Sequence, residues 1–256
     1  MGKTMKNFFK AYWKTLLFFA VIGLIGGFGV GFYLLDSYPE DMVQEIYAQG
    51  LNDTLIAVVT AVQSAAYGAV LGGIGIWLGK KTGLWRDERA ITRKPLLRAL
   101  TVAVIGGLAL ILPDILYFGK HVPAIAGSYA TKPTAAYLIG TVTYGAVIEE
   151  VMLRLFCMSL AAFLLWKVFD RKAEKPPVGI LMAANVISAL LFAAGHLPTT
   201  FLTIGATPLI IFRCFLLNGV FGLAFGWLYR KYGLRYAMMA HGGCHIISKL
   251  IWILFL

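Results

Sequence analysis

The stretch TLLFFAVIGLIGGFGVGFYLL, residues 15–35, decides the fold class of this chain. It carries no charged residue, and about 20 consecutive apolar residues are enough for an α-helix to cross a bilayer. Comparable apolar runs follow along the chain. The candidate spans are residues 15–35, 54–79, 96–118, 134–153, 155–169, 177–196, 205–229 and 236–256. Because the short run 155–169 can continue the span before it, we expect an all-α membrane bundle with seven or eight transmembrane passes.

Composition supports a membrane protein and excludes several other classes. Of the 256 residues, 59% are hydrophobic and 14% are charged, whereas an ordinary soluble domain has about 25% charged residues. A soluble enzyme or a disordered protein of this composition is therefore excluded. The net charge is +11, but the basic residues are not interleaved with aromatic residues that would contact bases. We therefore expect a lipid bilayer and no nucleic acid as partner. We expect one membrane domain over residues 1–256.

The distribution of basic residues predicts the orientation. Basic residues gather before the first span and in alternate loops, whereas the loop 36–53 is acidic. The basic segments are residues 3–14, 80–98, 171–175 and 230–235. Cytoplasmic loops carry an excess of Lys and Arg, so the N-terminus is expected in the cytoplasm. Short loops and the lack of a targeting sequence suggest a multi-pass protein of a prokaryotic plasma membrane.

Small residues recur at a spacing of four on several spans. Gly23, Gly27 and Gly31 form such a ridge on the first span. The same spacing recurs at Gly68 and Gly72, at Gly75 and Gly79, and at Gly222 and Gly226. Such ridges let helix backbones approach closely in lipid. We interpret them as packing surfaces within one chain in preference to a dimer interface, and the oligomeric state stays open.

Three charged residues lie together inside an apolar span: Glu149, Glu150 and Arg154. A charge at the centre of a bilayer costs about 2.5–3.5 kcal/mol on insertion scales, so these groups must face each other or a cavity. Glu150 and Arg154 are four residues apart on a helix and are expected to form an ion pair. Glu149 is turned by about 100° and is expected to point elsewhere, free to act as a base. The alternative is an ion-pair cluster that only locks helices together.

Three of the four histidines also lie in or at the ends of apolar segments: His196, His241 and His245. His241 and His245 are four residues apart, so their rings share one helix face. In a chain this poor in polar groups, three histidines and two glutamates predict one shared polar cavity that contains Glu149, His196 and His241. His196 and His241 can meet only if the segment 197–204, which contains Pro198, folds inward or if the last helix enters deeply.

Other polar residues inside spans have simpler interpretations. Arg213 is expected to extend to the membrane interface. Asn185 and Asn218 are expected to form hydrogen bonds between helices. A serine–histidine pair that uses Ser188 or Ser248 is a further option for catalysis, although neither serine lies in a GxSxG turn.

The three motifs, in this order, resemble the CAAX prenyl protease and bacteriocin-processing family, CPBP, whose members are intramembrane proteases with an all-helical core. The residues that carry the resemblance are Glu149-Glu150-x-x-x-Arg154, Phe192-x-x-x-His196 and the late His241. It covers about residues 134–250, whereas the N-terminal helices, residues 1–118, carry no recognisable motif. His245 stands where the family usually has asparagine.

The resemblance implies an endopeptidase that hydrolyses a peptide bond inside the membrane. Glu149 with His196 would activate a water, directly or through a bound metal ion. Glu150, held by Arg154, would orient the site, and His241 and His245 would bind the developing oxyanion. If the metal is zinc, its ligands would come from Glu149, His196, His241 and His245. A metal-free glutamate mechanism is equally open.

The implied substrate is a peptide or membrane protein, such as a prenylated CaaX peptide or a bacteriocin or pheromone leader, and a prokaryotic membrane favours peptide processing. Two functions of other classes stay open. The chain can be a non-enzymatic membrane scaffold or immunity regulator that retains the fold. It can also be a proton- or metal-coupled transporter in which the glutamates and histidines form a relay.

Overall fold

The computed structural model describes residues 2–87 and 90–256, and within these ranges every regular element is a helix. Seven helices are long and apolar enough to cross a membrane, which confirms the predicted all-α class. They are Lys6–Asp36, Asp53–Thr82, Arg93–His121, Ala135–Phe169, Val178–Thr203, Pro208–Tyr232 and Leu234–Phe255. The protein is therefore a multi-pass membrane protein.

The first three spans and their connectors form the N-terminal part of the bundle. The first span is α1 (Gly2–Asp36), and the connector α2 (Glu40–Ala48) leads to the second span. The second span consists of α3 (Asp53–Ala66), η1 (Tyr67–Leu71) and α4 (Gly72–Thr82). The third consists of α5 (Arg93–Pro113), η2 (Asp114–Phe118) and α6 (Gly119–His121), and α7 (Pro123–Ser128) follows it.

The last four spans carry the predicted site residues. The fourth span consists of α8 (Ala135–Ile139), η3 (Gly140–Met158) and α9 (Ser159–Phe169). The fifth is α10 (Val178–Thr203). The sixth consists of α11 (Pro208–Cys214), η4 (Phe215–Gly219) and α12 (Val220–Tyr232), and the seventh is α13 (Leu234–Phe255). The η elements are π-helices, whose hydrogen bonds join residues five apart.

Two sequence expectations about the spans were resolved by the structure. The runs 134–153 and 155–169 form one continuous helix, so the described residues contain seven candidate passes. Of the two arrangements that would let His196 and His241 meet, the inward fold of 197–204 is not the one observed, because α10 continues through Pro198 as far as Thr203. Neighbouring helices in a membrane bundle can tolerate the backbone hydrogen bond that proline removes.

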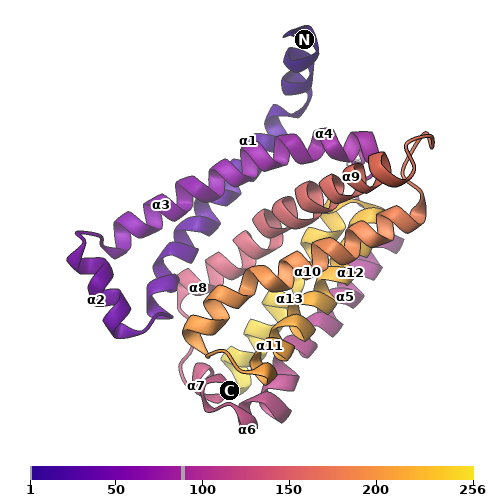
Figure 1. The fold of residues 1–256 in the computed structure, drawn as a ribbon. Helices are drawn as coiled ribbons and strands as arrows, with labels where there is room; N and C mark the ends of the chain where they lie inside the picture. Colours follow the sequence, from indigo (N-terminus) through magenta and orange to yellow (C-terminus); the bar gives the residue numbers. More distant parts are fainter. Residues whose placement is uncertain (1, 88–89) are drawn as a thin grey trace.

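The spans pack into two connected groups, which Figure 1 shows from one side. α1 and α3 lie side by side and are joined by α2 at one edge, whereas α13 packs against α5 and η3. η3 also packs against α1 and α10. The helix that carries Glu149 and Glu150 is therefore surrounded by α1, α10 and α13, and the two later histidine helices meet it directly.

Glycines make the close packing of α1 possible on two of its faces. A Cβ atom on Gly27 would lie 2.6 Å from the backbone oxygen of Thr60, and one on Gly31 would lie 2.5 Å from Cα of Ala57. On the other face, a Cβ on Gly26 would lie 2.7 Å from the backbone nitrogen of Tyr144 in η3. The predicted interpretation of this ridge as packing within one chain is confirmed.

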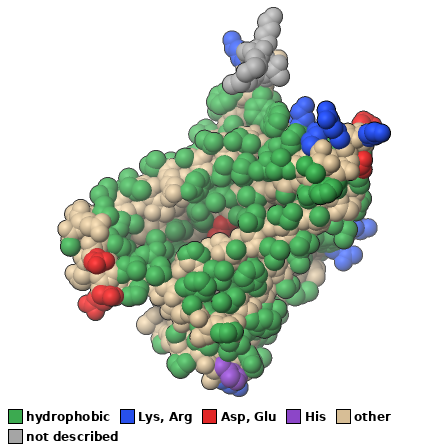
Figure 2. Space-filling model, in the orientation of Figure 1, with side chains coloured by type: hydrophobic (Ala, Val, Ile, Leu, Met, Phe, Trp, Pro, Cys, Tyr) green, Lys and Arg blue, Asp and Glu red, His purple; other side chains and the backbone are tan. Residues whose placement is uncertain are grey.

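Charged residues separate toward opposite ends of the molecule. Figure 2 shows most Lys and Arg side chains at one end, with a few acidic side chains among them, and acidic side chains around α2 at the other, with hydrophobic side chains covering most of the surface between them. This distribution is the one expected for a bundle whose sides face lipid tails and whose ends face water.

Candidate functional site

Glu150 and Arg154 form the expected ion pair on η3. Arg154 Nη1 lies 3.1 Å from Glu150 Oε1, and both side chains are completely buried. Two unpaired charges at this position would each be strongly unfavourable, so each group stabilises the other in its charged form.

The imidazole of His241 in α13 lies between the two glutamates. Its Nδ1 atom is 2.9 Å from Glu150 Oε1, and its Nε2 atom is 3.7 Å from Glu149 Oε2. Glu149 is therefore outside the Glu150–Arg154 pair and close to His241, as expected, whereas the contact of Glu150 with the same ring was not expected. More residues fit into each turn of a π-helix than of an α-helix, so consecutive residues diverge by a smaller angle and both carboxylates reach one ring.

These contacts fix the proton on the His241 ring. A carboxylate that is paired with Arg154 can only accept hydrogen bonds, so His241 Nδ1 must be the donor to Glu150. In the neutral ring Nε2 is then an acceptor, and it faces Glu149. At 3.7 Å the two atoms are beyond direct hydrogen-bond distance and within reach of one shared water.

Glu149 differs from Glu150 in its exposure. The Glu149 side chain is 21% exposed, whereas that of Glu150 is 0% exposed and that of His241 is 5% exposed. Figure 2 shows acidic atoms at the floor of a hollow midway along the molecule, between the α1–α3 side and α10. One carboxylate is thus locked in an ion pair, and the other is open to water or a ligand.

His196 lies beside this cluster on α10 and is linked to it through Phe192. The Phe192 ring contacts His196 and His241, with centroid distances of 4.8 Å and 5.7 Å. His196 Nδ1 is 2.8 Å from the backbone oxygen of Phe192 and must donate to it, which leaves Nε2 as the acceptor in the neutral ring. Within the described ranges, no hydrogen bond or ion pair joins His196 to either glutamate.

His245 stacks on His241, with ring centroids 5.0 Å apart and an interplanar angle of 28°. The lack of a side chain at Gly145 on η3 makes room for it, because a Cβ atom there would lie 2.9 Å from His245 Nε2. His245 Nδ1 is buried and has no hydrogen-bond partner among the described residues. The two α13 histidines therefore present one stacked pair to η3, as their spacing predicted.

Aromatic rings complete the surroundings of Arg154. Its guanidinium lies 4.4 Å from the ring centre of Phe192 and 5.3 Å from that of Phe225, in cation–π contact. Phe225 also stacks on His241 at 4.6 Å. Sequence reasoning did not find Phe225 or Gly145, because an aromatic residue or a glycine in an apolar helix gives no signal that distinguishes a site from ordinary packing.

Both serines considered for catalysis donate to backbone oxygens. Ser188 donates to Leu153 O at 2.7 Å, and Ser248 donates to His245 O at 3.1 Å. In the part of the chain that the structure describes, neither hydroxyl is hydrogen-bonded to a histidine ring, so the geometry gives no support to a serine–histidine pair.

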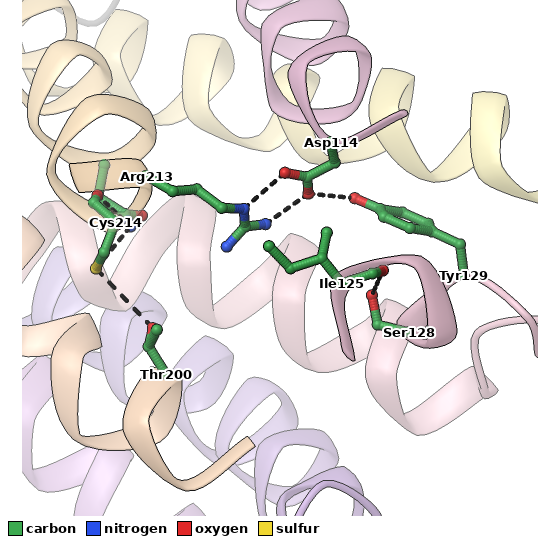
Figure 3. Close-up of polar contacts among 8 residues, drawn as sticks. Asp114, Ile125, Ser128, Tyr129, Thr200, Arg213 and Cys214 are labelled. Atoms are coloured by element: carbon green, nitrogen blue, oxygen red, sulfur yellow. Dashed lines mark hydrogen bonds and ion pairs between the residues drawn. The ribbon is translucent and has the colours of Figure 1, made fainter. Parts of the chain in front are cut away.

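A second buried ion pair corrects the interpretation of Arg213. Instead of extending to the interface, Arg213 donates two hydrogen bonds to Asp114, at 2.6 Å and 2.5 Å, and Tyr129 donates to the same carboxylate at 2.8 Å. Figure 3 shows these three side chains in one line, with Thr200 beside Cys214. Burial and the Asp114 charge raise the pKa of Tyr129 above its ordinary value, so its phenol stays a donor.

The two asparagines have different partners. Asn185 of α10 donates to Leu223 O of α12 at 3.0 Å, which confirms the expected bond between helices. Asn218 donates to Cys214 O, four residues earlier in its own span, so the same expectation was wrong for Asn218. An asparagine side chain can bond a carbonyl of its own helix, whereas Asn185 reaches α12 at the place where Gly226 has no side chain.

A bound metal ion would need several ligand side chains close together. Among the described residues, no three His, Cys, Asp or Glu side chains are placed so that they could hold one metal ion. A zinc site needs at least three protein ligands. The described side chains therefore do not fit a zinc ion as they are placed, and the zinc-ligand assignment of Glu149, His196, His241 and His245 stays a prediction.

The fold and the buried acid–histidine cluster define a class: a polytopic helical membrane protein with a polar site inside the bundle. A family model described as type II CAAX prenyl endopeptidase Rce1-like matches residues 131–247. Residues 131–247 thus match the Rce1-like type II CAAX prenyl endopeptidase family, within CPBP, and this match implies an intramembrane peptidase. No curated protein and no solved structure matches the chain.

Proposed function

We propose that the protein hydrolyses a peptide bond with a water that Glu149 and His241 activate together. The observation that carries this proposal is the position of His241 between two carboxylates of unlike surroundings. Glu150 is neutralised by Arg154 and fixes the ring. Glu149 is partly exposed and faces the other ring nitrogen. An acid–base pair with one fixed and one accessible member suits general-base catalysis.

The proton transfers follow from these positions. A water between Glu149 and His241 Nε2 would lose a proton to Glu149 as its oxygen attacks the peptide carbonyl. The C–N bond of the tetrahedral intermediate would then break, and the same proton would pass to the leaving nitrogen. Water and one peptide bond thus give a carboxyl group and an amine, and Glu149 returns to its carboxylate form.

The remaining residues would stabilise the intermediate. His245 stacks on His241, and an N–H of its ring would donate to the oxyanion in place of the usual asparagine. Since the Nδ1 proton of His241 is held by Glu150, this ring would bind the oxyanion only when Nε2 is protonated as well. His196, beside Phe192, would contact the substrate or the leaving group.

The substrate class we propose is a membrane-associated or leader peptide. The site lies inside a bundle whose sides are apolar, so a peptide held in or at the bilayer reaches it more readily than a soluble protein does. The basic end of the bundle would lie in the cytoplasm of a prokaryotic cell, with the protein in the plasma membrane.

The test compares peptide termini in membranes from cells that express the wild-type chain or Glu149→Gln. New N- and C-termini, identified by mass spectrometry, are expected with the wild type and absent with Glu149→Gln at equal expression. The matched control is Glu174→Gln, which changes an exposed glutamate in the loop after α9 and should leave the pattern unchanged. Identical termini in wild type and Glu149→Gln would refute the proposal and favour the scaffold.

A further inference from the structure

A groove of about 450 Å³ opens at the basic end of the bundle, away from the glutamate–histidine cluster. It lies between the start of α1, the segment after α4 and the start of α13. All three segments belong to parts of the chain that are rich in Lys and Arg. The groove therefore lies where the bundle meets the headgroups of one leaflet.

The groove has an apolar wall and a basic rim. Phe18 and Phe19 of α1 and Met238 and Met239 of α13 supply apolar surface, and Arg86 and Arg235 supply the charges. Gly233 has φ = +104° and lets the chain turn into α13 close to the Arg86 side chain, since a Cβ atom on Gly233 would lie 3.4 Å from Arg86 Cδ. The chain turn thus helps to hold one of the two rim charges in place.

Asp87, which lines the groove, is paired with a lysine. Asp87 accepts hydrogen bonds from Tyr12 at 2.8 Å and from Trp85 Nε1 at 2.7 Å, and Lys80 lies 3.5 Å away. These donors hold its carboxylate in place. Lys80 offsets the negative charge of Asp87, so among the described residues the charges of the two rim arginines are in excess.

The rim arginines keep donors available. Arg86 donates to the backbone oxygen of Arg230 at 3.3 Å, and Arg235 donates to that of Ala90 at 3.1 Å. Among the described residues neither guanidinium forms an ion pair with a carboxylate. A guanidinium has five N–H donors in a planar fork whose geometry matches a phosphate or a carboxylate.

We propose that this groove binds an anionic phospholipid of the adjoining leaflet, with its phosphate between Arg86 and Arg235 and an acyl chain along Phe18, Phe19 and the two methionines. The apolar wall favours a lipid over a free phosphate ion. Since an acyl chain is already in an apolar medium in the bilayer, moving it into the groove gains little. The two arginines therefore set the selectivity, and phosphatidylglycerol should bind better than zwitterionic phosphatidylcholine.

The first experiment uses native mass spectrometry of the detergent-purified full chain with equal amounts of phosphatidylglycerol and phosphatidylcholine. Each basic residue near a bilayer surface contributes about fivefold in affinity, so Arg86→Gln with Arg235→Gln should lower the preference for phosphatidylglycerol roughly thirtyfold. The matched control, Arg171→Gln with Lys172→Gln, removes two exposed charges from another basic loop and should change it little. The double variant Arg86→Lys with Arg235→Lys keeps both charges and should retain most of the preference for phosphatidylglycerol.

A second measurement does not depend on those variants. Phosphatidylglycerol with brominated acyl chains should quench the fluorescence of Trp85, which lines the groove. The quenched component should be missing in Trp85→Phe. Equal lipid selectivity in the Gln pair and the wild type, or equal quenching with and without Trp85, would overturn the proposal. Displacement of the lipid by inorganic phosphate alone would also overturn it, because a free anion would then be sufficient.

Discussion

His241 Nδ1 and Glu150 Oε1 lie 2.9 Å apart, although 91 residues separate them in the chain. This bond joins the fourth span to the seventh and sets the tautomer of the ring, so that Nε2 points to Glu149. Glu150 thus acts on the proposed chemistry through His241, as a positioning residue, and Arg154 holds the Glu150 carboxylate.

This arrangement predicts that stability and activity respond differently at Glu150. Glu150→Gln leaves Arg154 buried without its counter-charge and should cost about 3–5 kcal/mol of unfolding free energy, whereas adding Arg154→Met should restore most of it. Peptide hydrolysis should stay low in both variants, because the Nδ1 proton of His241 is no longer held by a carboxylate. Thermal unfolding in micelles and analysis of peptide termini measure the two effects. Recovery of hydrolysis in the double variant would contradict the positioning role.

Gly145 and His245 should depend on each other. The Cβ atom of Gly145→Ala would lie 2.9 Å from His245 Nε2 and 3.6 Å from His241 Nε2, so the stacked rings must shift. We expect a loss of activity of about tenfold or more, because a misplaced oxyanion donor is costly. The shorter side chain of His245→Asn should relieve the contact and recover activity in the double variant. Gly179→Ala, at a position with open space around it, is the control and should behave as the wild type.

The Asp114–Arg213 pair predicts an effect on stability away from the chemistry. Asp114 is 0% exposed at its side chain, so Asp114→Asn should lower the unfolding free energy by about 3–5 kcal/mol. Combining it with Arg213→Met should recover much of this loss. Asp36→Asn, at an exposed position, should leave the thermal midpoint within a degree or two of the wild type, on the order expected for surface changes. A midpoint for Asp114→Asn equal to that of Asp36→Asn would refute the role of the pair.

If each of the seven candidate spans in the described ranges crosses the membrane once, the two termini lie on opposite sides. The basic segments predict the N-terminus and the loop after α9 on the cytoplasmic side, and the α2 connector on the other. Cysteine residues introduced one at a time at exposed positions such as Glu40 and Lys172 should react oppositely with an impermeant thiol reagent added to intact cells. Labelling of Lys172→Cys and not of Glu40→Cys would reverse the proposed orientation.

The sequence predicted the spans well because length and apolar content directly determine whether a helix can cross a bilayer. It also predicted the Glu150–Arg154 pair and the common face of His241 and His245, since both follow from a spacing of four. It did not predict that Glu149 and Glu150 share His241, because that contact depends on the π-helical turns of η3. The partner of Arg213 was missed for a different reason: Asp114 is 99 residues away, and periodicity within one helix cannot indicate such a contact.

The glycines of α1 that pack against η3 limit how this protein can be divided into separately folding parts. The family match begins at residue 131, yet Gly26 and Gly29 of α1 lie against Tyr144 and Gly140 of the helix that carries both glutamates. The start of the family match at residue 131 is thus not the start of an independently folding unit. A chimaera that transplants only residues 131–247 would leave the helix that carries the glutamates without the glycine face of α1 against which it packs. A chimaera that also includes α1 would keep this packing contact.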